Sequence, residues 1–235
     1  MQLFYSASIS EDSDQYTFSR EESKHVIRVL RKQVGESVDI TNGKGFLFRG
    51  EIIDDNPNKC TIQLHSTSFQ KPLPYKLHIA IAPTKLNDRF EWFLEKATEI
   101  GITEITPIIC DHSERKLIKE ERFKKIVQSA MKQSLQTHLP MLHPITTFKD
   151  FMTSQSQASF SCIAHCEEAE KLPLTKELTA TKDILILIGP EGDFSSEEIK
   201  HAVSAGYKEI TLGSSRLRTE TAGIVACHSI AFLHQ

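Results

Sequence analysis

The chain has 235 residues, enough for one large domain or two small ones with a substantial buried core. Apolar residues make up 39% of it and charged residues 25%, and no apolar run is long enough to cross a bilayer. The net charge of −3 gives no global reason to bind nucleic acid, so a basic surface would have to be local. The five cysteines are odd in number and irregularly spaced, which disfavours a disulfide framework. We therefore expect a cytoplasmic protein without a membrane segment.

Residues 1–70 are predicted to form a small, mainly β unit. Ser19 and Glu22 have the spacing of a capping box, so a short helix is expected from about Arg20 to Lys32, with Val26, Val29 and Leu30 facing inward. Three strands are predicted, at Ser37–Thr41, Gly45–Ile53 and Cys60–Ser66.

Basic residues are concentrated on this helix and the loops that follow it. Any single one is most simply a solvated surface charge, and together they are compatible with an RNA contact. They are Lys24, Arg28, Arg31, Lys32, Lys44 and Arg49.

The run Lys71–Pro74 is rich in proline and is the best candidate for a linker, and after it strands and helices alternate. This alternation predicts a parallel α/β sheet over residues 74–235. Strands are expected at Leu77–Ala82, Ile105–Cys110, Phe160–His165, Ile184–Ile188 and Glu209–Leu212. Helices are expected at Asp88–Ile100, at Glu120–Leu135, from Ser195 to Gly206 with a capping box to Glu198, and from Thr219 onward.

The final helix is apolar on most of its sides, so it must be buried in the core or against a partner subunit. In a parallel α/β sheet, ligands bind at the carboxyl ends of the strands. Two polar strand-to-helix junctions occur at such ends, Ile188–Ser195 and Leu212–Gly223, which predicts one site formed by both.

The first junction lacks the spacing of a Walker loop or of a dinucleotide-binding fingerprint. Tight turning before the Ser195 helix explains Gly192 but leaves Glu191 without a purpose. In the second junction Arg216 and Arg218 alternate with Leu217, so an arginine can face a pocket. A solvated arginine pair would be the simpler interpretation if the first junction were absent.

Three other constellations carry less weight, and we expect no metal site. Cys162, His165 and Cys166 lack a second pair of metal ligands at a suitable spacing. Cys227 and His228 are neighbours on a helix and point apart. The run Asp111–Glu114 contains the residue types of a catalytic triad, but adjacency in sequence is not triad geometry.

The chain resembles the ribosomal RNA small-subunit methyltransferase E family of the SPOUT superfamily, along nearly its whole length. The motifs that carry the resemblance are His25–Arg31, Lys96–Gly101, Ser113–Arg115, Ile188–Gly192 and Leu217–Ala222. The last two are specific, whereas the first two would be weak alone.

The resemblance implies an N-terminal PUA-like β-barrel, residues 1–70, that helps to hold RNA. It implies a C-terminal α/β domain with a deep trefoil knot, residues 74–235, that binds the cofactor and forms a homodimer. It further implies S-adenosylmethionine as methyl donor and N3 of a uridine in 16S rRNA, or in the small ribosomal subunit, as acceptor. No membrane or metal partner is implied.

The expected site residues fall into three groups. For the chemistry we expect Arg218, Arg216, Glu191 and Glu220, with the arginines stabilising charge on the base and one glutamate accepting the proton. For the cofactor we expect His165, Leu187, Ile188, Gly189, Glu191, Gly192, Leu212, Gly213, Ser214, Leu217, Thr219 and Thr221. For RNA we expect Lys24, Arg28, Arg31, Lys32 and Arg115.

The chain departs from the family's common pattern at a few positions. Asp193 stands where a second glycine is usual, and Ser215 where an arginine is usual, with Arg216 one place later. Gln136 stands where many relatives carry a basic residue. Two alternatives remain open: a SPOUT-like methyltransferase acting on another RNA, such as transfer RNA, and a non-catalytic RNA-binding dimer.

Overall fold

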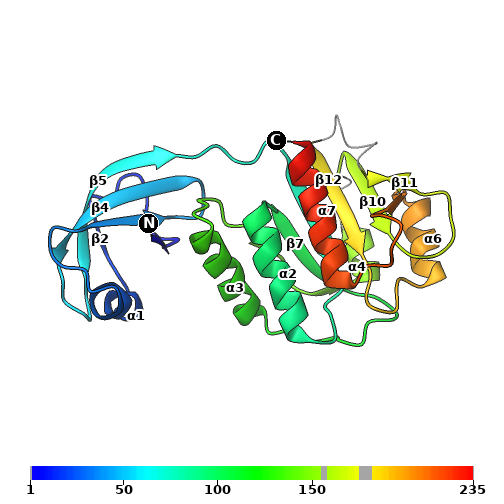
Figure 1. Cartoon of the computed structure of the whole chain (residues 1–235), viewed down its shortest axis with the longest axis horizontal. Helices are drawn as coiled ribbons and strands as arrows, with labels where there is room; N and C mark the ends of the chain where they lie inside the picture. The colour runs from blue at the N-terminus through cyan, green and yellow to red at the C-terminus, as the bar shows by residue number, and fades with distance from the viewer. Residues whose placement is uncertain (1, 155–157, 175–181, 235) are drawn as a thin grey trace. The chain divides into compact units, whose positions relative to one another are not determined.

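The computed structural model describes residues 2–154, 158–174 and 182–234, and these separate into two compact units. The first unit comprises Met1–Pro72 and Met131–Leu139, and the second comprises Leu73–Ala130 and Pro140–Gln235. Figure 1 traces the elements of each unit in chain order. Within the described residues, no helix has the length and apolar character needed to cross a membrane.

The first unit is a five-stranded mixed sheet with a short helical segment. Strands occur in the order β1-β3-β4-β5-β2, and all pairs are antiparallel except β1 with β3. Its core contains Val26, Ile40, Phe48, Ile52 and Ile62, all fully buried. The elements are β1 (Leu3–Tyr5), β2 (Gln15–Thr17), α1 (Arg20–Lys24), η1 (His25–Val29), β3 (Ser37–Thr41), β4 (Phe46–Asp54) and β5 (Thr61–Phe69).

The predicted helix from Arg20 to Lys32 is shorter than expected. The N-cap prediction is confirmed, because the Ser19 hydroxyl accepts the amide N–H of Glu22 at 3.2 Å. After α1 the chain adopts the wider π-helical turn of η1, and Arg31 then takes a left-handed backbone with φ of 57°. This wider turn rotates the following side chains, so Val26 is buried while Val29 is 65% exposed, contrary to the prediction.

Residues 131–139 complete the first unit although they lie far along the chain. The amide N–H groups of Gly45 and Leu139 donate to the carbonyls of Thr137 and Gly43, both at 2.9 Å. The Thr137 hydroxyl donates to Oε1 of Gln70 at 2.8 Å. The sequence offered no sign that this segment belongs with the N-terminal strands.

The second unit is built on an eight-stranded sheet in which every pair of strands is parallel. The strand order is β11-β13-β10-β12-β6-β7-β8, with β9 also paired to β7. The parallel α/β prediction is therefore confirmed. The strands are β6 (Lys76–Ile81), β7 (Glu104–Ile109), β8 (Met141–Leu142), β9 (Thr146–Thr147), β10 (Phe160–Ala164), β11 (Leu172–Pro173), β12 (Asp183–Ile188) and β13 (Lys208–Thr211).

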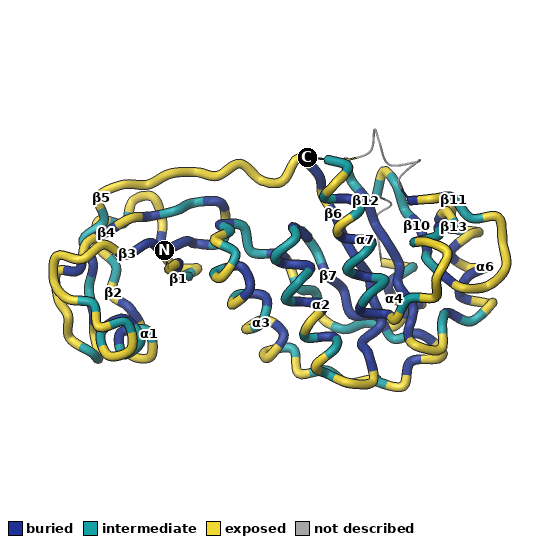
Figure 2. Tube along the Cα trace, viewed as in Figure 1, coloured by how far each residue is buried: buried dark blue, intermediate teal, exposed yellow. Residues whose placement is uncertain are grey.

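Helices cover both faces of this sheet, so its central strands are buried, as Figure 2 shows for β6, β7 and β12. On one face α2 and α7 pack against each other and α7 packs on β6 and β12 (Figure 1). On the other face, residues of α4 and α6 join the cluster formed by Ala80, Ile108 and Leu187. The helices of the chain's second part are α2 (Asn87–Ile100), α3 (Glu120–Gln133), α4 (Phe148–Ser154), α6 (Ser196–Ser204) and α7 (Thr219–Leu233).

Candidate functional site

A cavity of about 680 Å³ opens at the carboxyl ends of three neighbouring strands, β13, β10 and β12. We call it the strand-end cavity. Each of these strands is followed by a polar loop at the edge of the sheet. The lining residues are Ala164, His165, Cys166, Lys171, Ile188, Gly189, Pro190, Glu191, Asp193, Ile210, Thr211, Leu212, Gly213, Ser214, Ser215, Arg216, Leu217, Arg218, Thr219 and Ala222.

The two junctions singled out in the sequence lie on the same cavity. The residues expected there that line it are His165, Ile188, Gly189, Glu191, Leu212, Gly213, Ser214, Arg216, Leu217, Arg218 and Thr219. Four others do not line it: Leu187, Gly192, Glu220 and Thr221. Leu187 is fully buried in the core beneath the cavity, because successive residues of a strand face opposite sides of the sheet.

The 189–193 loop is attached to other parts of the second unit at several points. The Thr219 hydroxyl donates to the Gly189 carbonyl at 3.1 Å, which joins this loop to the start of α7. The His112 ring Nδ1 donates to the Gly192 carbonyl at 3.0 Å. A Cβ atom on Gly192 would lie 3.0 Å from the Cβ of His112, so the glycine permits this close approach. The cavity wall is therefore held in place by contacts behind it.

Asp193 occupies a left-handed backbone conformation, with φ of 66°. Glycine adopts this conformation without steric cost, and aspartate is among the few other residues that tolerate it. Its carboxylate accepts the amide N–H of Cys166 at 2.6 Å and that of Phe194 at 2.9 Å. The side chain thus links the loop after β12 to the end of β10, a contact that a glycine could not make.

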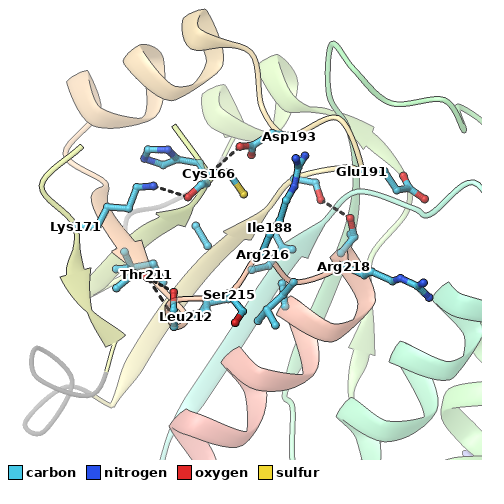
Figure 3. Close-up of a pocket in the computed structure, with 18 of the residues that line it drawn as sticks. Cys166, Lys171, Ile188, Glu191, Asp193, Thr211, Leu212, Ser215, Arg216 and Arg218 are labelled. Atoms are coloured by element: carbon cyan, nitrogen blue, oxygen red, sulfur yellow. Dashed lines mark hydrogen bonds between the residues drawn. The ribbon is translucent and has the colours of Figure 1, made fainter. Parts of the chain in front are cut away.

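The two arginines of the 212–218 loop point in different directions. In Figure 3 the Arg216 side chain crosses the cavity toward the side where Cys166 and Asp193 lie, whereas the Arg218 side chain points away from Leu212. Burial raises the pKa of the Cys166 thiol, and the nearby Arg216 charge acts in the opposite direction. Both arginines line the cavity, one across it and one at its edge.

The two candidate proton acceptors differ in access. Glu191 is exposed, lines the cavity, and accepts the backbone N–H of Lys85 at 2.9 Å through Oε1. Glu220 is buried, its Oε1 lies 3.9 Å from Nε of Arg89, and its Oε2 has no hydrogen-bond partner among the residues that the structure describes. Of the two, only Glu191 borders the cavity.

His165 continues the wall at the end of β10. Its Nε2 lies 2.9 Å from Oε1 of Glu209 on β13, and within the described part of the chain its buried Nδ1 has no hydrogen-bond partner. The Lys171 amino group donates to the His165 carbonyl at 2.7 Å, so it fixes the backbone of the cavity wall just after β10. The sequence motifs do not single out Lys171, because it lies six residues beyond His165 and outside the two loops on which the site prediction rests.

The basic residues expected to bind RNA lie on both units. Arg28 and Arg31 are exposed, Lys24 and Lys32 are half-buried, and Lys32 donates to the Ser37 carbonyl at 3.0 Å. Arg115, in the second unit, directs its guanidinium at the backbone carbonyls of Thr84 and Lys85. These bonds fasten the Lys85 segment, whose amide in turn binds Glu191.

Two of the three constellations given less weight have structural explanations. Cys227 is fully buried, and burial raises its pKa to about 12, while the adjacent His228 is exposed. In the Asp111–Glu114 run, Ser113 accepts the amide of Cys110 at 2.9 Å. Neither constellation forms a nucleophile–base pair.

Comparisons with known proteins agree with this geometry. The model of the RNA methyltransferase domain family matches residues 71–231, and that of the RNA methyltransferase PUA domain matches residues 18–64. A ribosomal RNA small subunit methyltransferase E from Buchnera aphidicola is 30% identical over 92% of this chain and 87% of its own length.

Solved structures extend the likeness to three dimensions. A protein of Porphyromonas gingivalis described as a probable rRNA-methyltransferase is 40% identical, with a TM-score of 0.92 over 100% of this chain and 98% of that one. A ribosomal RNA small subunit methyltransferase E of Neisseria gonorrhoeae bound to S-adenosyl methionine is 25% identical, with a TM-score of 0.86 over 99% and 98% of the two chains.

Proposed function

Because this chain belongs to the ribosomal RNA small-subunit methyltransferase E family, we propose that it transfers a methyl group from S-adenosylmethionine to RNA of the small ribosomal subunit. The observation that carries the proposal is the strand-end cavity. Residues of both specific family motifs, Ile188–Gly192 and Leu217–Ala222, line it together. The acceptor that the family resemblance indicates is N3 of a uridine in 16S rRNA.

The cavity suits the cofactor in size and in lining. Its volume of about 680 Å³ lies within the ~300–1,000 Å³ that is usual for small-molecule sites. Ile188, Leu212 and Leu217 offer apolar surface for an aromatic base, while Asp193 and Arg216 offer opposite charges for a zwitterionic chain. Gly213 has φ of 133°, and no atom of the described residues lies within 4 Å of where its Cβ would be, so backbone groups there are open to a ligand.

The methyl donor supplies an electrophilic carbon when bound, and the chain's residues orient the acceptor and manage its charge. Uridine N3 must lose its proton, and the negative charge then spreads onto the flanking carbonyl oxygens. A guanidinium at the cavity stabilises that charge, since a preorganised cation is effective where water is excluded. We assign this role to Arg218, with Arg216 as the second candidate.

Accessibility supports Glu191 as the proton acceptor. It borders the cavity, whereas Glu220 is buried beside Arg89 and does not. The Lys85 amide fixes one Glu191 oxygen and leaves the other available for a proton, directly or through a water.

We assign RNA binding to residues 1–70 and cofactor binding to residues 74–235, with the knotted chain path of the family in the second part. The PUA family match over residues 18–64 and the exposed Arg28 and Arg31 support the first assignment. Because the substrate is ribosomal RNA, we place the protein in the cytoplasm, which agrees with its five free cysteines.

The proposal includes a homodimer formed through α7. Ile224, Val225, His228 and Phe232 lie along one side of this helix and are only partly covered within the chain. Three of the four side chains are apolar, and side chains at this helical spacing fit a second copy of the same helix surface.

The substrate assignment is tested by mass spectrometry of ribosomal RNA nucleosides from cells with and without the gene. We expect 3-methyluridine to disappear from 16S RNA when the gene is deleted and to return with the wild-type chain. Its persistence after deletion would contradict the assignment, and loss of a methylated nucleoside from transfer RNA instead would favour the alternative substrate.

The charge-stabilising role is tested with Arg218→Ala and Arg216→Ala. Removing a donor of this kind typically lowers kcat by roughly 100- to 1,000-fold. We expect that loss for Arg218→Ala with unchanged cofactor affinity by calorimetry. Arg122→Ala is the matched control, because Arg122 pairs with Glu91 on α2 and does not line the cavity. Full activity in Arg218→Ala with loss in Arg216→Ala would transfer the role to Arg216.

A further inference from the structure

A cluster of two histidines and a glutamate lies away from the strand-end cavity. His78 is the third residue of β6 and is paired in register with Glu104, the first residue of β7. His143 follows β8, two residues after Met141, which is also in register with Glu104. Side chains two residues apart on a strand share a face, so parallel pairing brings all three side chains to the same face.

The three ligand-type atoms are close enough to share an ion. Nε2 of His143 lies 2.8 Å from Oε2 of Glu104, and Nδ1 of His78 lies 4.0 Å from the same oxygen. One ligand atom from each residue lies within 4.8 Å of the others. Zinc bonds of about 2.0–2.2 Å in a tetrahedron place ligand atoms roughly 3.4 Å apart, so small side-chain rotations would suffice.

The remaining polar atoms of two ligands are already held by neighbours. Nε2 of His78 is 2.7 Å from the Thr106 hydroxyl, which leaves Nδ1 as the nitrogen directed at the cluster. Oε1 of Glu104 accepts the Lys76 amino group at 2.9 Å, which leaves Oε2 for the other side. Metal-binding histidines and carboxylates are commonly oriented in this way by outer hydrogen bonds.

The cluster is partly buried and retains a route to solvent. The side chain of His78 is 9% exposed, that of Glu104 18% and that of His143 30%. An ion can therefore enter beside His143, and a water molecule can complete its coordination.

We propose that His78, Glu104 and His143 bind one divalent transition-metal ion, and that Zn²⁺ is the ion this donor set fits best. Two imidazoles and one carboxylate are a known zinc ligand set, and imidazole selects transition metals over Mg²⁺ and Ca²⁺. The Lys76 charge stays on the outer oxygen of Glu104 and does not occupy the ligand position.

The site serves the fold rather than the methyl transfer. His78 and Glu104 lie toward the amino ends of β6 and β7, whereas the strand-end cavity lies at the carboxyl ends of β10, β12 and β13. Bound metal would fasten His143, the residue after the two-residue strand β8, to the neighbouring strand β7 and to β6 beyond it. The sequence did not suggest this site, because His78 lies 26 residues before Glu104 and His143 lies 39 residues after it.

The test uses the full-length protein after treatment with a chelator, titrated with Zn²⁺ by calorimetry and with Co²⁺ by visible absorption. We expect one Zn²⁺ per chain, tetrahedral Co²⁺ bands, and a rise in Tm with Zn²⁺. The variants His143→Ala and Glu104→Gln should weaken Zn²⁺ binding at least tenfold. Thr106→Val should weaken it by roughly 10- to 100-fold through loss of the outer hydrogen bond.

The matched control is His201→Ala, which removes an exposed histidine of the same unit outside the cluster and should leave Zn²⁺ affinity unchanged. Equal Zn²⁺ binding in the wild type and His143→Ala would overturn the proposal. Circular dichroism checks that each variant is folded. If His143→Ala does not fold, the wild type decides, since a chain without tetrahedral Co²⁺ bands and without a Zn²⁺-dependent Tm has no such site.

Discussion

Asp193 shows how one side chain can take over a position that favours glycine. Its left-handed backbone carries a steric cost, and its two hydrogen bonds, to the amides of Cys166 and Phe194, offset that cost. Aspartate at this position therefore adds a link between two walls of the strand-end cavity. The 189–193 loop is held by the side chain as well as by its backbone.

Replacing Asp193 separates these two effects. We expect Asp193→Ala to lower the free energy of unfolding by roughly 1–3 kcal/mol, because it keeps the strained backbone and loses both hydrogen bonds. Asp193→Gly should cost less, since it relieves the strain. Urea denaturation measures both. If the alanine variant is as stable as the glycine variant, the strain argument fails.

Glu191 allows a test of its chemical role that leaves its structural role intact. In Glu191→Gln the amide oxygen can still accept the Lys85 N–H, but the side chain can no longer accept a proton at neutral pH. We expect a fall in methylation rate of roughly 100- to 10,000-fold, with partial recovery as the pH is raised and hydroxide replaces the base. Glu220→Gln is the comparison, and a larger loss there than in Glu191→Gln would contradict the assignment.

For single residues, the sequence predicted that the loops 188–195 and 212–223 form the site, but it did not predict the direction of their side chains. In the sequence, Glu191 and Glu220 are equally good candidates for the proton acceptor. Only the fold shows that the first carboxylate borders the cavity and that the second is buried. Arg115 was expected to contact RNA, and the structure directs its Nε at backbone carbonyls of its own unit. Such orientations depend on neighbours that are distant in sequence.

Among the elements, the packing of α7 against α2 depends on one glycine. A Cβ atom on Gly223 would lie 2.6 Å from Cε2 of Phe93 and 3.0 Å from Cδ1 of Ile81. Phe93 is fully buried and cannot move aside freely. The helix that begins at the strand-end cavity is thereby brought close to the sheet.

Gly223→Ala should therefore destabilise the protein although alanine is the better helix former by about 1 kcal/mol. Overpacking a filled core usually costs about 1–3 kcal/mol, which exceeds the helix-propensity gain, so we expect a net loss of up to roughly 2 kcal/mol in urea denaturation. The double variant with Phe93→Leu should lose less than the sum of the two single changes. A stabilised Gly223→Ala protein would show that the helices can separate without cost.

Long, regular elements were predictable and short ones were not. The apolar runs of β6, β7, β10, β12 and β13 were placed within a residue or two, and the capping box of α6 is present as expected. The two- and three-residue strands β1, β2, β8, β9 and β11 were missed, because so few residues carry no detectable alternation. Helix α4 was missed as well.

At the scale of the whole molecule, the partly covered side of α7 is the surface through which we propose that the dimer forms, so the oligomeric state is the property to measure. Phe232 is 65% exposed and stacks on His228. We expect Phe232→Glu to convert the proposed dimer to monomer in light scattering, because a charge would be buried at the interface. Leu117→Glu is the control, since Leu117 is 82% exposed and lies outside α7. If the wild-type protein is a monomer in light scattering, the proposed dimer is contradicted.

Because the segment 131–139 completes the first unit, it determines when that unit can finish folding during synthesis. A chain leaves the ribosome from its amino end, and the residues between Pro72 and Leu139 take on the order of ten seconds to synthesise. During that interval the N-terminal strands have been made but lack the carbonyl of Thr137 and the amide of Leu139. The domain translated first is finished only when part of the second has emerged, so its final closure on the ribosome waits for that later stretch of chain.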